Sequence, residues 1–220
     1  MYNRTGKPLK WLLRAIFSIK MTSMKLIAIS WPEFFKGEAD IINDLFAAGL
    51  YRLHVRKPDA DEASVSSLIA QIDPSFHSRL AIHYFPTIAL QTPGAGIHLS
   101  HGTRCIPPHW NGTISRSCHT IAEAEREKTN VDYLFLSPIF DSVSKSGYKA
   151  AFSEDELREA ARRGVIDGKV VALGGITPAN VGRVEELGFG GVAVLGGLWG
   201  DLSHDDVMIR FGEYGRGVGE

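Results

Sequence analysis

The chain has few of the features that mark disulfide-linked, membrane-spanning or nucleic-acid-binding proteins. Its two cysteines, Cys105 and Cys118, form no CxxC motif and cannot build a disulfide framework, so we expect a reducing cytoplasm. The formal net charge is −1, and no basic stripe interleaved with aromatic residues runs through the body of the chain. We therefore expect neither a nucleic acid nor a membrane as a partner.

Acidic residues are absent from the first 25 positions, which are basic. The apolar run at 11–19 is interrupted by Arg14, is too short to span a bilayer and lacks a signal-peptide cleavage site. It is either an amphipathic surface helix or the product of a start codon placed upstream of Met21 and Met24. We predict that residues 1–24 are a basic extension outside the fold and that residues 25–220 form one domain.

Short apolar runs alternate with helix-like segments along the whole chain, which predicts parallel strands joined by crossover helices. Eight such units in 220 residues predict an α/β fold, the parallel eight-stranded (β/α)8 TIM barrel. An open doubly wound sheet is the alternative, but no GxGxxG motif follows an early strand. One helix of the ring is expected to be missing between the fourth and fifth strands. The predicted strands span residues 25–30, 51–56, 79–85, 96–100, 113–118, 131–138, 170–176 and 192–197.

Two of these strands end in glycine pairs, Gly174-Gly175 and Gly196-Gly197. Such pairs can simply end a strand tightly, but two of them at βαβ spacing favour a phosphate site after the seventh and eighth strands. The loop after the sixth strand adds Ser142, Ser144 and Lys145, whose hydroxyl and ammonium groups suit anion oxygens.

Four histidines, His54, His83, His98 and His119, fall near the ends of four successive predicted strands. Each alone is more often a hydrogen-bonded structural residue, but the set indicates a pocket capable of proton transfer, because imidazole titrates near neutral pH. Zinc is a competing interpretation. No HxH or HExxH spacing and no inward carboxylate supports it, so we expect no metal.

An ordered set of segments from about residue 25 to 202 resembles the thiamine phosphate synthase/TenI superfamily. The matching segments are LHVRK at 53–57, GIHL at 96–99, DYLFLSPIF at 132–140 through Lys145, LGGI at 173–176 and VAVLGG at 192–197. The resemblance implies a (β/α)8 barrel that handles a thiazole phosphate as its small-molecule partner in thiamine biosynthesis.

The chain departs from the synthases of this superfamily at their magnesium site. Those enzymes carry an Asn-Asp pair at the end of the third strand and another Asp after the fourth, which hold the Mg²⁺ of a pyrimidine diphosphate. Here the pair aligns with His83-Tyr84, residues 100–104 contain no acid, and a lysine of the second-strand motif falls on Pro58. Mg²⁺ needs hard oxygen ligands. We therefore expect no cofactor, and Mg²⁺ only if the chain is a synthase.

The stretch Arg116-Ser117-Cys118-His119-Thr120 is similar to the Arg-Ser-x-His-Ser sequence of the TenI branch. The resemblance implies a metal-independent thiazole tautomerase, an isomerase, in which His119 is the acid/base and Arg56 binds the thiazole carboxylate. His83 and His98 are further catalytic candidates, and His54 and Ser117 are substrate-binding candidates. The alternatives are a diverged thiamine phosphate synthase, a transferase, and a non-catalytic thiazole-phosphate binder or regulator. A homo-oligomer is compatible with all three.

Overall fold

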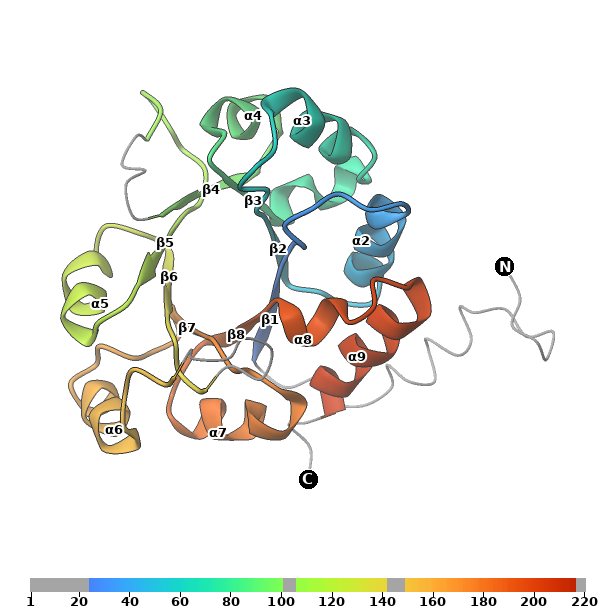
Figure 1. The fold of residues 1–220 in the computed structure, drawn as a ribbon. Helices are drawn as coiled ribbons and strands as arrows, with labels where there is room; N and C mark the ends of the chain where they lie inside the picture. Colours follow the sequence, from blue (N-terminus) through green and yellow to red (C-terminus); the bar gives the residue numbers. More distant parts are fainter. Residues whose placement is uncertain (1–23, 101–105, 142–148, 217–220) are drawn as a thin grey trace.

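The computed structural model describes residues 24–100, 106–141 and 149–216, which form a closed barrel of eight parallel strands with helices outside it (Figure 1). The strands are β1 (Lys25–Ile29), β2 (Arg52–Val55), β3 (Leu80–His83), β4 (Gly96–Leu99), β5 (Ile114–Cys118), β6 (Tyr133–Leu136), β7 (Val170–Leu173) and β8 (Gly191–Val194). Each strand pairs with the next one in sequence, and β8 pairs with β1. The predicted TIM barrel is confirmed, and the open doubly wound alternative is wrong.

The helices alternate with the strands. They are α2 (Glu38–Ala47), α3 (Glu62–Ala70), α4 (Pro86–Gln91), α5 (Ile121–Glu127), α6 (Glu154–Arg162), α7 (Val181–Glu186), α8 (Gly196–Trp199) and α9 (His204–Arg216), with 3-10 turns η1 (Pro74–Arg79) and η2 (Pro178–Asn180). The described residues between β4 and β5 contain no helix, as expected. Within the described ranges, no helix has the length and apolar character needed to cross a membrane.

Apolar side chains form two separate clusters. The larger one fills the space between the outer wall of the barrel and the helices, and it includes Met24. The smaller one lies inside the barrel and consists of Ile27, Ile29, Phe135, Val171 and Ala193, from β1, β6, β7 and β8. The interior faces of β2 to β5 are therefore free to carry polar groups.

The expected basic extension, residues 1–24, lies outside the described residues apart from Met24.

Several strands end earlier than their apolar sequence predicts. β3 ends at His83 because Tyr84 adopts a left-handed backbone with φ of 64°, and Phe85 then caps α4. β6 ends at Leu136, although Ile139 in the following loop is buried. The predicted strands were therefore too long, because they included apolar loop residues that pack under the helices.

A buried ion pair fixes α2 to the end of β2. The Lys57 ammonium donates to both carboxylate oxygens of Glu38, at 2.6 and 2.8 Å, and to the carbonyl oxygen of Glu33 at 2.9 Å. Burial raises the pKa of the Glu38 carboxyl and lowers the pKa of Lys57, while their mutual contact acts in the opposite direction on both. Lys57 is thus bound to the scaffold.

Removal of this ammonium tests the role of the pair. Lys57→Ala leaves the Glu38 carboxylate buried without its partner, so the free energy of unfolding should fall by about 3–5 kcal/mol. Urea denaturation measures the loss, with the exposed Lys36→Ala as matched control, expected within about 0.5 kcal/mol of the parent. Equal stabilities for the two variants would show that the pair is dispensable.

Candidate active site

Three of the four predicted histidines lie inside the barrel. His54 is the third residue of β2, His83 the last of β3 and His98 the third of β4, and they are 0%, 4% and 3% exposed. Alternate residues of a strand face the same side, so these positions project inward. The expectation of strand-end positions holds for His83. His54 and His98 each lie one residue before the last residue of their strands, so they too are near strand ends.

His54, on β2, is hydrogen-bonded to one side chain of β3 and to one of β6. Its Nδ1 lies 3.0 Å from His83 Nε2, and its Nε2 lies 2.6 Å from the Tyr133 hydroxyl oxygen. The ring of His83 stacks on that of His98 with centroids 4.2 Å apart, and Phe135 packs against His54 at 4.6 Å. The three imidazoles therefore form one packed group.

His98 is held by two serines of β5. The Ser115 hydroxyl donates to the Ile97 carbonyl oxygen, so it accepts from His98 Nδ1 across 2.9 Å. A neutral imidazole has one donor and one acceptor nitrogen, so Nε2 accepts from the Ser117 hydroxyl, also at 2.9 Å. Ser117, the predicted substrate-binding residue, thus contacts His98 directly.

All three interior imidazoles are held neutral. Burial, followed by the charges of His98 and Arg52, lowers the pKa of His54 well below 6.5. The pKa of His83 is also lowered well below 6.5, first by burial and then by the other two histidines and Arg56. For His98, burial with Arg56 and Arg116 lowers the pKa to about 3. Neutral rings can pass protons along hydrogen bonds without carrying a buried charge.

His119 lies apart from this group, directly after β5. Its Nδ1 is 3.2 Å from the Ser137 carbonyl oxygen and 3.3 Å from the Ser137 hydroxyl, at the end of β6. Its backbone N–H donates to Glu123 Oε2 at 2.7 Å, beside the Thr120 cap of α5. The side chain is exposed at the carboxyl end of the barrel, where TIM-barrel active sites form.

Arg56 follows β2 at the same end. Its backbone N–H donates to the Ser30 hydroxyl at 2.8 Å, and its guanidinium carbon lies 6.0 Å from the centre of the Tyr84 ring. Among the described residues its side chain forms no ion pair with a carboxylate. It is the cation that lowers the pKa of both His83 and His98.

The glycine pairs follow β7 and β8 as predicted, and packing accounts for part of their presence. Gly174 and Gly175 have φ of 95° and 65°, and a Cβ on Gly175 would overlap the carbonyl oxygen of Asp141. A Cβ on Gly197 would overlap the Tyr214 hydroxyl, which donates to the Ile176 carbonyl at 3.0 Å. Gly196 begins α8. Phosphate binding at these turns stays a prediction.

Three predicted anion-binding residues, Ser142, Ser144 and Lys145, lie outside the described residues. Three residues that sequence reasoning missed, Arg52, Ser115 and Tyr133, line the interior beside the histidines. The alternation of side chains along a strand could have identified two of them. Arg52 lies two positions before His54 and Tyr133 two positions before Phe135, so each faces the same side as an interior residue.

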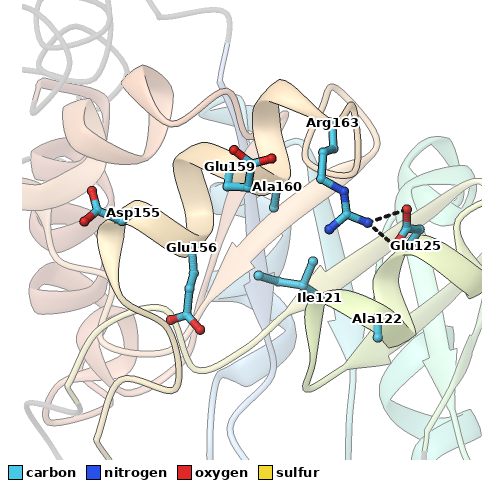
Figure 2. Close-up of a pocket in the computed structure, with 8 residues that line it drawn as sticks. All are labelled: Ile121, Ala122, Glu125, Asp155, Glu156, Glu159, Ala160 and Arg163. Carbon is cyan, nitrogen blue, oxygen red and sulfur yellow. Dashed lines mark hydrogen bonds and ion pairs between the residues drawn. The ribbon is translucent and has the colours of Figure 1, made fainter.

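A groove of about 650 Å³ lies on the outer ring between α5 and α6 (Figure 2). Its polar lining is mostly acidic, with Glu125, Asp155, Glu156 and Glu159, and its Arg163 is already paired with Glu125 at 2.7 Å. An acidic lining repels a phosphorylated ligand. The candidate active site is therefore the mouth of the barrel.

The three interior imidazoles could in principle hold a metal ion, because their ligand nitrogens lie within 4.8 Å of one another. Both nitrogens of His54 and of His98, however, are engaged in hydrogen bonds. Arg52, Arg56 and Arg116 add positive charge around the rings, which disfavours a further cation. We keep the expectation of a metal-free site as a prediction.

A family model described as thiamine monophosphate synthase, TMP-TENI, matches residues 26–198. The chain belongs to this family. A crystal structure of thiamine phosphate pyrophosphorylase from Bacteroides thetaiotaomicron is similar, with 35% identity, a TM-score of 0.80 and coverage of 88% of this chain and 97% of that one. The predicted superfamily is confirmed.

Curated relatives in the family carry the name thiamine-phosphate synthase. The protein of Actinobacillus succinogenes is 30% identical over 118 residues, covering 50% of this chain and 53% of the relative. That of Geobacillus kaustophilus is 25% identical over 171 residues, covering 73% and 77%. The chain thus spans about half the length of some relatives that it matches. These names denote a transferase activity. They do not denote the tautomerase activity that the resemblance at residues 116–120 implies.

The Mg²⁺ ion that a TMP-TENI synthase would use needs oxygen ligands, preferably carboxylates. At the carboxyl ends of β3 and β4 the described residues are His83, Tyr84 and Ser100, none of which is acidic. His83 Nε2 is hydrogen-bonded to His54, and the Tyr84 ring faces the Arg56 guanidinium. These residues do not fit a magnesium–diphosphate site.

The neutral histidines predict a loss of stability in mild acid. Their folded-state pKa values lie below the unfolded value of about 6.5, so the unfolded chain binds more protons as the pH falls below that value. Stability is complete above about pH 6.5 and falls by about 1.4 kcal/mol per pH unit for each such histidine below it.

Urea unfolding at pH 5, 6, 7 and 8 measures this slope, and His98→Gln should reduce it by the contribution of one group. A parent slope near zero between pH 5 and 6.5 would mean that the buried rings are already protonated in the folded state.

Proposed function

We propose that this member of the TMP-TENI family binds a phosphorylated thiazole in thiamine biosynthesis and isomerises it as a metal-independent tautomerase. One observation carries the proposal. The end of β3 carries His83, which lies in a neutral hydrogen-bonded group of imidazoles, where a magnesium-dependent synthase would need carboxylates. Tautomerisation needs groups that move protons, not a cation that binds diphosphate.

His119 suits the role of a general base. The Ser137 carbonyl oxygen can only accept a hydrogen bond, so the proton of the neutral ring lies on Nδ1. The lone pair of Nε2 is then free to remove a proton from the thiazole ring. A second proton donor at the mouth then protonates the exocyclic carbon, and aromatisation drives this transfer.

Binding of the substrate is assigned to groups at the same end of the barrel. Arg56 has no carboxylate partner among the described residues and can bind the thiazole carboxylate through its fork of donors. The turns at Gly174-Gly175 and Gly196-Gly197 would hold the phosphate, with Ser142, Ser144 and Lys145 as further contacts. His98 and Ser117 would line the floor of this site.

The synthase reaction is the second candidate, and the names of the curated relatives favour it. In that reaction the thiazole phosphate would join a pyrimidine diphosphate at the same mouth. The absence of acidic groups at the described ends of β3 and β4 argues against it, because the diphosphate charge would lack its counter-ion.

Loss of the His119 imidazole should abolish most of the isomerase activity. His119→Ala should lower kcat for the exocyclic-to-aromatic thiazole conversion by about 10²–10⁴-fold, the usual contribution of a general acid–base group. Ultraviolet absorbance of the aromatic product measures the rate. His204→Ala, on α9 and bonded to Asp44, is the control and should keep the parent rate. A His119→Ala enzyme as fast as the parent would remove His119 from the mechanism.

Turnover with both substrates separates the candidate functions. The purified parent protein, given thiazole phosphate, pyrimidine diphosphate and Mg²⁺, should form little thiamine phosphate while it converts the thiazole tautomer alone. Robust thiamine phosphate formation would establish the synthase. Tight thiazole phosphate binding with neither reaction would establish a non-catalytic binder.

A further inference from the structure

A line of three side chains crosses the barrel interior from its amino end to its carboxyl end. Tyr133 is the first residue of β6, His54 lies in the middle of β2 and His83 is the last residue of β3. Their contacts are short, at 2.6 Å between Tyr133 and His54 and 3.0 Å between His54 and His83. We propose that Tyr133, His54 and His83 form a proton relay that connects water at the amino end of the barrel to the active site. This relay rests on the proposed tautomerisation.

The amino end of the relay opens onto a pocket of about 220 Å³. Most of its lining comes from residues at or before the starts of strands, among them Lys25, Arg52, Thr113, Asp132, Tyr133 and Gly168. A pocket of this size and polarity holds several water molecules. Water there can exchange protons with the Tyr133 hydroxyl.

The chemistry of Tyr133 fits the entry point. Burial raises the pKa of its hydroxyl to about 12, so the phenol keeps its proton and can donate to His54 Nε2. The Arg52 guanidinium lies 5.5 Å from the centre of the ring. Two Arg52 nitrogens, Nε and Nη1, are buried without a partner among the described residues, which indicates further water at this end.

His54 can only relay a proton, because it has no contact with solvent. It is 0% exposed, and both of its nitrogens are engaged. When the Tyr133 hydroxyl donates to Nε2, the proton of the neutral ring lies on Nδ1 and points to His83 Nε2. Each ring then receives a proton on one nitrogen and releases one from the other.

His83 delivers the proton to the mouth. Its second nitrogen, Nδ1, has no hydrogen-bond partner among the described residues. When Nδ1–H protonates the exocyclic carbon, His83 Nε2 takes the His54 proton, His54 Nε2 takes the Tyr133 proton, and Tyr133 takes one from pocket water. The proton removed from the thiazole ring stays on His119, which is exposed and releases it to the hydroxide left in solvent. No imidazolium forms inside the barrel, where burial and three arginines oppose it.

A purely structural network would show the same distances, so the test follows proton movement. In ¹⁵N-histidine-labelled protein, exchange of the His54 ring N–H with water is measured by NMR for the parent, Tyr133→Phe and Tyr51→Phe. Tyr51 is the matched control, because it lines the same pocket but lies outside the relay. Tyr133→Phe should slow this exchange about tenfold or more and Tyr51→Phe should not, because the phenol proton is the only link to pocket water in the relay.

Tautomerase kinetics give the second measurement. In Tyr133→Phe we expect kcat to fall about tenfold with KM unchanged, and a curved proton inventory in H₂O–D₂O mixtures to become linear. His54→Phe breaks the relay at its centre and should have the same effects on kcat and on the inventory. Exchange and inventory unchanged in Tyr133→Phe would overturn the relay, whatever the change in stability.

The two measurements separate the two proposals. A parent protein without tautomerase activity, but with His54 exchange that depends on Tyr133, would refute the proposed function and support the relay. Active parent and Tyr133→Phe proteins with identical exchange would refute the relay and support the function.

Discussion

Polar atoms enclosed by the barrel must find their partners inside it, and this requirement organises the whole site. β2 to β5 place imidazoles and hydroxyls in the interior, while β1, β6, β7 and β8 supply the apolar cluster around Phe135. Each ring nitrogen of His54 and His98 is hydrogen-bonded to a side chain of another strand. An unpaired buried polar atom costs about 1–3 kcal/mol, so loss of any one member affects the others. The network therefore acts as a unit of both packing and chemistry.

This arrangement makes the protonation state of the interior part of the fold. A charged ring would lie in a poorly solvated space beside Arg52, Arg56 and Arg116, so burial and charge act together to keep the rings neutral. His119 lies outside this constraint, since its ring is exposed and bonded to Ser137 at the rim. The site thus combines an exposed imidazole at the rim with buried imidazoles that must stay neutral while they exchange protons.

The sequence predicts most of the architecture, because alternating apolar runs and helix-like segments report directly on a (β/α)8 barrel. It also predicts that His54, His83 and His98 are important, but not what they contact. The contact of His54 with Tyr133 spans 79 positions in sequence and depends on how the strands tilt as the barrel closes. The glycine pairs illustrate a second limit. Gly197 is required where the Tyr214 hydroxyl approaches, and a sequence motif cannot separate such packing from ligand binding.

The charges at the mouth link this interior to the choice of reaction. Arg56 is a cation without a carboxylate partner in the described ranges, and the end of β3 beside it carries His83 and Tyr84. A magnesium–diphosphate would bring a cation to a region that is already positive and that offers nitrogen and phenol groups in place of carboxylates. An anionic thiazole carboxylate brings the opposite charge and needs only proton transfer. Neutral imidazoles supply that transfer without competing with Arg56 for the carboxylate. The electrostatics of the mouth and the hydrogen bonds of the interior therefore favour the same chemistry.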